Sequence, residues 1–130
     1  MNSILLGRLH IREILATGRI DSIQKAEFKV FSQFGEDGII QYLINTIPIP
    51  NRSFIEFGTQ YYTESNTRFL LMNNNWNGLV IDGGKKYVDY IRHDEAVYRL
   101  HNLTAVQKFI TTENINQVFE DNGFVGDIGL

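Results

Sequence analysis

The apolar residues of this chain change their spacing near residue 50. Over residues 3–15 they fall mostly on one face of a helix, although Gly7 weakens that pattern. A stronger helical pattern runs through residues 35–47, opens on two acidic residues that suit the positive end of a helix dipole, and stops at Pro48. The sequence therefore predicts two helices ahead of the first strand.

Two short apolar runs follow, and each of them ends at glycine. Residues 53–58 read Ser-Phe-Ile-Glu-Phe-Gly and residues 79–84 read Leu-Val-Ile-Asp-Gly-Gly, which are patterns typical of buried strands. Between them, residues 63–67 include several side chains that can begin a helix, which then continues to about Asn75. A strand, a helix and a strand within about 30 residues have the length of one parallel crossover.

The second half of the chain continues this alternation. Residues 85–100 carry apolar side chains at near-helical spacing, and residues 103–110 alternate in part, which predicts a third strand. Thr111 or Thr112 can begin a further helix, and residues 124–130 are interpreted as the approach to a fourth strand. The pattern predicts an α/β fold with a parallel sheet covered on both faces, a class that binds ligands beyond the carboxyl ends of its strands.

Composition narrows the class of protein further. With 130 residues, 43% of them hydrophobic, the chain can form one packed core. It has no cysteine, which excludes disulfide frameworks and thiolate zinc sites and favours the cytoplasm. No apolar stretch approaches the roughly 20 residues of a membrane span, and the start lacks a signal-peptide pattern. The net charge of −3 gives no electrostatic reason to expect nucleic acid as a partner, and the three histidines are too widely spaced for a helical metal site.

Two acidic residues stand at the ends of the first two predicted strands. Glu56 and Asp82 are each followed by glycine within two positions, and adjacent parallel strands would bring both to one edge of the sheet. A carboxylate after the second strand can accept hydrogen bonds from both ribose hydroxyls. The alternative interpretation is that Asp82 only begins a turn, because Asp-Gly is a common turn dipeptide.

The loop after the first strand limits the choice of cofactor. Residues 58–62 lack the G-x-G-x-x-G spacing and a Walker lysine, which disfavours a pyrophosphate cofactor. A nucleoside that carries an amino acid remains compatible, since its carboxylate can meet backbone N–H groups near Ser65, Asn66 and Thr67. Glu64 and Arg68, four residues apart on a predicted helix, are interpreted as a surface ion pair, and Trp76 as a packing residue.

Three segments, taken in order, resemble the cofactor motifs of class I S-adenosylmethionine-dependent methyltransferases. They are residues 54–58 (Phe-Ile-Glu-Phe-Gly), residues 63–71 (Thr-Glu-Ser-Asn-Thr-Arg-Phe-Leu-Leu) and residues 75–83 (Asn-Trp-Asn-Gly-Leu-Val-Ile-Asp-Gly). The resemblance is closest to the FkbM-like group, which is often encoded among bacterial surface-polysaccharide genes. Residues 32–38 (Ser-Gln-Phe-Gly-Glu-Asp-Gly) are similar to the segment that precedes the first strand in that group.

The resemblance implies a Rossmann-like, three-layer α/β/α domain that binds S-adenosyl-L-methionine. The loop of residues 56–58 would lie beside the methionine part of the cofactor, and Asp82 would take the ribose hydroxyls. The implied cofactor-binding residues are Glu56, Gly58, Thr59, Ser65, Asn66, Asp82 and Gly83. The acceptor would be a hydroxyl of a sugar or a similar small molecule, and no residue is assigned as a catalytic base.

The family pattern also sets the expected domain organisation. Residues 1–30 would form a helical extension, and residues 31–130 would be the N-terminal half of the methyltransferase domain, truncated after the third strand or at the fourth. Gln60 departs from the pattern, which often has a second glycine there. Such a portion is expected to be inactive by itself.

Two other functions remain open. One is a non-catalytic Rossmann-like module that associates with itself or with a partner through an exposed strand edge, since an unpaired edge recruits another strand. The other is half of a nicotinamide-dependent dehydrogenase, which the missing glycine fingerprint disfavours.

Overall fold

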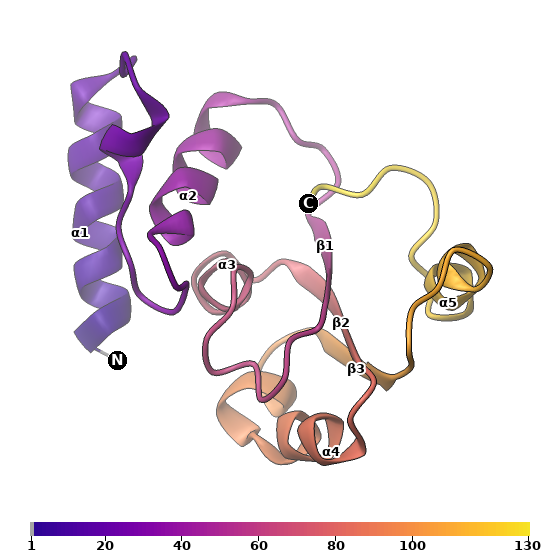
Figure 1. Ribbon diagram of the computed structural model, residues 1–130. Coiled ribbons are helices and arrows are strands. Elements are labelled where there is room, and N and C mark those ends of the chain that lie inside the picture. The colour runs from indigo at the N-terminus through magenta and orange to yellow at the C-terminus, as the bar shows by residue number, and fades with distance from the viewer. Residues whose placement is uncertain (1) are drawn as a thin grey trace.

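The computed structural model describes residues 2–130 as helices packed around a small parallel sheet (Figure 1). The helices are α1 (Asn2–Thr17), α2 (Glu36–Thr46), α3 (Arg68–Asn74), α4 (Lys85–His93) and α5 (Ile115–Asp121). The strands are β1 (Ser53–Phe57), β2 (Asn77–Asp82) and β3 (Leu103–Gln107), which lie in the order β1-β2-β3. Both neighbouring pairs are parallel, as the alternation of strands and helices predicts.

Apolar side chains cover both faces of the sheet. On one face, Phe54 and Val80 pack with residues of α2, α3 and α4, and on the other Leu79 and Ile81 pack with Val118 of α5. Figure 1 shows the corresponding layers, with α2 and α3 on one side of the strands and α5 on the other. The predicted α/β class with a covered parallel sheet is thus confirmed, and the arrangement is compatible with a Rossmann-like fold.

Helix α1 packs against α2, and its Gly7 lies against a core residue of α3. Gly7 is buried, and a Cβ atom there would come within 2.8 Å of the Phe69 ring of α3. The glycine that weakens the helical pattern in the sequence is therefore the residue that permits close packing of α1.

Three details differ from the sequence-based expectation. The helix expected over residues 85–100 ends at His93, and a π-helical turn (Glu95–Arg99) follows it. Asp94 adopts an extended conformation at the junction, where its carboxylate lies 3.7 Å from the Arg68 guanidinium. β3 ends at Gln107 rather than near residue 110, and α5 is preceded by Asn114 rather than by a threonine. The Thr111 hydroxyl instead accepts a hydrogen bond from the Asn114 N–H at 3.2 Å.

The last described residues pair with the outer edge of β1. The Leu130 N–H donates to the Ser53 carbonyl at 3.2 Å, and the Ile55 N–H donates to the Leu130 carbonyl at 3.0 Å. These two bonds are the pattern of a parallel ladder in which Leu130 lies opposite Phe54. Residues 124–130 therefore approach the sheet on the far side of β1 from β2, as the sequence predicts for the approach to a fourth strand.

Candidate functional site

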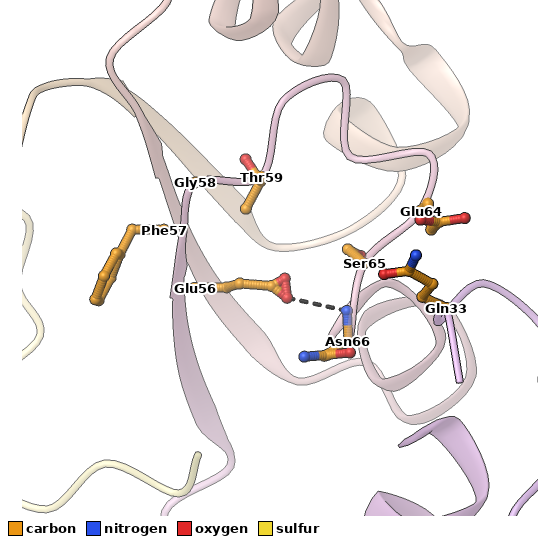
Figure 2. Close-up of a pocket in the computed structure, with 8 residues that line it drawn as sticks. All are labelled: Gln33, Glu56, Phe57, Gly58, Thr59, Glu64, Ser65 and Asn66. Atoms are coloured by element: carbon orange, nitrogen blue, oxygen red, sulfur yellow. Dashed lines mark hydrogen bonds between the residues drawn. The ribbon is translucent and has the colours of Figure 1, made fainter. Parts of the chain in front are cut away.

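The candidate site lies beyond the carboxyl end of β1. The chain turns away at Gly58, runs through a loop, and enters α3 at Arg68, so that loop and helix start enclose a pocket of about 240 Å³ (Figure 2). Its lining residues are Gln33, Glu56, Phe57, Gly58, Thr59, Glu64, Ser65 and Asn66. Five of the seven residues that the sequence assigns to cofactor binding are thereby brought together, all but Asp82 and Gly83.

Glu56 connects β1 to the start of α3. Its Oε1 atom accepts hydrogen bonds from the Asn66 N–H at 3.0 Å and from the Thr67 hydroxyl at 3.3 Å (Figure 2 shows the bond to Asn66). The Tyr62 hydroxyl lies 2.8 Å from the Thr67 oxygen. Because a hydroxyl has one proton, Thr67 can donate to Glu56 only when Tyr62 donates to Thr67. The residues just before α3 therefore hold the Glu56 carboxylate in place at the pocket.

Burial sets the electrostatics of Glu56. Desolvation raises the pKa of its carboxyl above the ordinary glutamate value, against the hydrogen bonds from Asn66 and Thr67 that lower it. Burial likewise raises the pKa of Tyr62, so its hydroxyl remains protonated as the donor to Thr67. A cationic group in the pocket would favour the charged form of Glu56.

Asp82 closes β2 beside this pocket without lining it. Its Oδ1 atom accepts the Gly84 N–H and its Oδ2 atom accepts the Gln60 N–H, each at 2.8 Å. The first bond shows that Asp82 begins a turn. The second shows that Asp82 also holds the loop after β1, because Gln60 belongs to that loop. Contact of Asp82 with a ribose stays a prediction.

The loop itself depends on unusual backbone conformations. Gly58, Gln60 and Tyr62 have positive φ angles of 73°, 51° and 62°. Such angles favour glycine, and side chains there carry strain that the surrounding contacts must offset. Gln60 thus holds a glycine-like conformation at the position where the resemblance leads one to expect a second glycine, and the Asp82 carboxylate accepts its N–H.

Thr59 places a buried polar atom at the pocket wall. The residue is 6% exposed, and within residues 2–130 its hydroxyl has no hydrogen-bond partner. A buried hydroxyl without a partner is costly, so Thr59 is a site of incomplete hydrogen bonding in the pocket wall.

Two weaker sequence interpretations have different outcomes. Trp76 is 3% exposed and belongs to the core, which confirms its packing role. The surface ion pair between Glu64 and Arg68 is wrong, because Glu64 lies in the loop before α3 rather than on the helix. Arg68 instead donates to the Tyr62 carbonyl at 3.1 Å and lies 3.7 Å from Asp94.

The sequence did not predict several residues that line the pocket or lie beside it. Gln33 lines the pocket although it precedes β1 by 20 residues, and only the quoted segment of residues 32–38 gave a signal for it. Phe109, which follows β3, is 77% exposed and lies over Gly83, where a Cβ atom would meet the Phe109 ring at 2.2 Å. Tyr61 packs edge-on against Tyr87 and adds a second exposed aromatic ring nearby.

Comparison with protein-family models, with curated proteins and with solved structures finds no match to this chain. In the described part of the chain, no three His, Asp or Glu side chains gather in a way that could hold a metal ion. None of the helices described over residues 2–130 is both long enough and apolar enough to cross a membrane. The function proposed below is therefore based on the arrangement of the site residues.

Proposed function

We propose that this chain binds S-adenosyl-L-methionine at the carboxyl ends of β1 and β2, as the cofactor-binding portion of an FkbM-like methyltransferase. The observation that carries the proposal is the pocket between β1 and α3, where Glu56 meets the helix start and Asp82 holds the adjoining loop. Ligands of parallel α/β sheets bind at such an edge, beyond the carboxyl ends of the strands.

The chemistry of the lining suits the amino-acid end of this cofactor. Glu56 and Glu64 offer carboxylates to an ammonium or sulfonium group, and the side chains of Ser65 and Asn66 offer hydrogen-bond donors. The nucleoside would extend past the loop toward Asp82. There its ribose can use the remaining lone pairs of a carboxylate that is 9% exposed, and its base can stack on Phe109.

The proposed reaction transfers the methyl group from the sulfonium to an acceptor hydroxyl, of a sugar or a similar small molecule. The acceptor oxygen forms the new bond to carbon, the carbon–sulfur bond breaks, and the hydroxyl proton leaves to solvent or to a base. Such a transfer depends chiefly on alignment of the two reacting atoms. No residue of this chain is assigned as the base.

Calorimetric titration of the purified chain with S-adenosylhomocysteine tests the proposal. We expect saturable binding to the wild-type chain, and weaker binding to Asp82→Asn, which keeps an acceptor oxygen but removes the charge that ribose hydroxyls prefer. NADH is the matched control ligand, because a dehydrogenase half would bind the dinucleotide more tightly. Absence of heat with S-adenosylhomocysteine at millimolar concentration, from a chain shown to be folded, would contradict the proposal.

A second candidate function is association through the edge of β1. In a parallel ladder, alternate residues direct their backbone groups to the same edge of the strand. The Ile55 carbonyl and the Phe57 N–H therefore point to the outer edge of β1, the edge on which Leu130 pairs beside Phe54. The Phe57 residue is 54% exposed. A strand from a second copy could bind there, in line with the general behaviour of open edges. Unlike the first candidate, this function requires no cofactor.

A further inference from the structure

We infer that Gln33 is a ligand-binding residue that contacts the amino-acid end of the cofactor, held in place by the segment of residues 26–38. This inference rests on the proposed function, because it assigns one more residue to the same pocket. It concerns a residue that precedes β1 by 20 positions and that reaches the pocket only through the fold.

A buried carboxylate fixes the backbone on which Gln33 stands. Asp37 is 1% exposed, and its Oδ2 atom accepts the N–H groups of Val30, Phe31 and Ser32 at 2.8, 2.7 and 2.9 Å. In return, the Ser32 hydroxyl accepts the Asp37 N–H at 3.1 Å. The residues immediately before Gln33 are therefore tied to the first turn of α2.

A glycine brings the same segment close to α2. The Gly38 N–H donates to the Phe28 carbonyl at 3.1 Å, and a Cβ atom at Gly38 would lie 2.0 Å from the Ala26 carbonyl oxygen. Because that neighbour is backbone, any side chain at position 38 would push the segment away from the helix.

Two further contacts attach the segment to the pocket wall. The Phe31 carbonyl accepts the Ser65 N–H at 3.2 Å, and the Arg68 guanidinium lies 4.8 Å from the centre of the Phe31 ring. Ser65 itself lines the pocket, so the Phe31–Ser65 bond sets the distance between Gln33 and the opposite loop. The backbone around Gln33 is thus held from both sides.

The backbone of Gln33 is fixed, whereas its side chain is exposed at the pocket. Figure 2 shows its amide beside Ser65 and near Glu64, on the side of the pocket opposite Gly58. An amide offers both a donor and an acceptor, which suit the carboxylate and the ammonium of an amino acid. Because the backbone is already fixed, binding would have to order only this one side chain, which limits the entropic cost of the contact.

Paired titrations of Gln33→Ala test the inference. S-Adenosylhomocysteine carries the amino-acid end, whereas 5′-methylthioadenosine has the same nucleoside without it. We expect Gln33→Ala to weaken binding of S-adenosylhomocysteine by about tenfold, the effect of a hydrogen bond to a charged group, and to leave binding of 5′-methylthioadenosine unchanged. Phe34→Ala is the matched control, because Phe34 is 73% exposed on the same turn and does not line the pocket.

The outcomes separate this inference from the proposed function. Unchanged binding of S-adenosylhomocysteine to Gln33→Ala, with normal binding to the wild type, overturns the role of Gln33 alone. Equal weakening of both ligands also overturns it, because a general change of the pocket would then explain the loss. Failure of the wild-type chain to bind either ligand overturns the proposed function, and the inference with it.

Discussion

At the scale of single residues, Glu56 has the least usual environment in the pocket. Its carboxylate is desolvated, yet two groups at the start of α3 donate hydrogen bonds to it. Burial of this carboxylate lowers the stability of the empty protein, and under the proposed function a cationic ligand would offset that cost, a common compromise at binding sites.

We predict that Glu56→Gln changes how stability depends on pH. Because burial raises the pKa of Glu56 in the folded chain, its contribution to stability is complete below the ordinary value of 4.5 and is lost as the pH rises through the raised pKa. The variant should therefore gain stability relative to the wild type as the pH rises from about 4 to 7.

Urea unfolding at a series of pH values measures this difference, with Glu64→Gln as the control. Glu64 lines the same pocket but is exposed. A wild-type chain that instead gains stability over Glu56→Gln as the pH rises would show that the hydrogen bonds outweigh desolvation.

Thr59 leads to a second prediction at this scale. Since its buried hydroxyl has no partner within the described residues, Thr59→Val should leave the thermal midpoint unchanged or raise it. The same substitution should weaken S-adenosylhomocysteine if the hydroxyl serves the ligand. A fall of several degrees in the midpoint, measured by circular dichroism, would mean that the hydroxyl has a structural partner.

At the scale of elements, residues 26–38 connect α2 to the wall of the pocket. We predict that Asp37→Ala lowers the free energy of unfolding by about 3 kcal/mol, because one buried and two partly buried N–H groups lose their acceptor. Glu36→Ala is the matched control and should cost no more than about 1 kcal/mol, since Glu36 is mostly solvated and accepts one exposed N–H. Chemical denaturation measures the free energy of unfolding of both variants. Equal losses of stability would refute the proposal that Asp37 holds residues 26–38 on α2.

The elements also show how far the sequence can predict this molecule. Helices α1 and α2 and strands β1 and β2 follow from periodicity and from their flanking glycine and proline residues. The break after α4 does not, and at this break the carboxylate of Asp94 lies near the guanidinium of Arg68, a residue 26 positions earlier in the chain. Local patterns report local preferences, whereas contacts distant in sequence are set by packing.

The same distinction applies to the candidate site. Glu56, Ser65 and Asn66 could be predicted because they adjoin the end of one strand and the start of the next helix. Gln33 could not be placed, since it depends on the bonds of Asp37 and on the contact of Phe31 with Ser65. The structural role of Asp82 toward Gln60 was hidden for the same reason.

At the scale of the whole molecule, the second candidate function depends on the outer edge of β1. We predict that, if this edge mediates association, the chain forms a concentration-dependent dimer and Phe57→Lys abolishes it, because a charged side chain beside an open edge opposes strand pairing. Sedimentation equilibrium of both proteins measures the mass. A wild-type chain that stays at 15.0 kDa at all concentrations would exclude this second function.

The most direct test of the central claim is to map the binding of S-adenosylhomocysteine onto the backbone by nuclear magnetic resonance. A chain of 15.0 kDa is well suited to amide spectra. The account predicts saturable shifts confined to residues 56–67, to residues 82–84, to Phe109, and to Gln33 and its neighbours. Absence of shifts at millimolar ligand, or shifts on α1 and α5 instead, would contradict it.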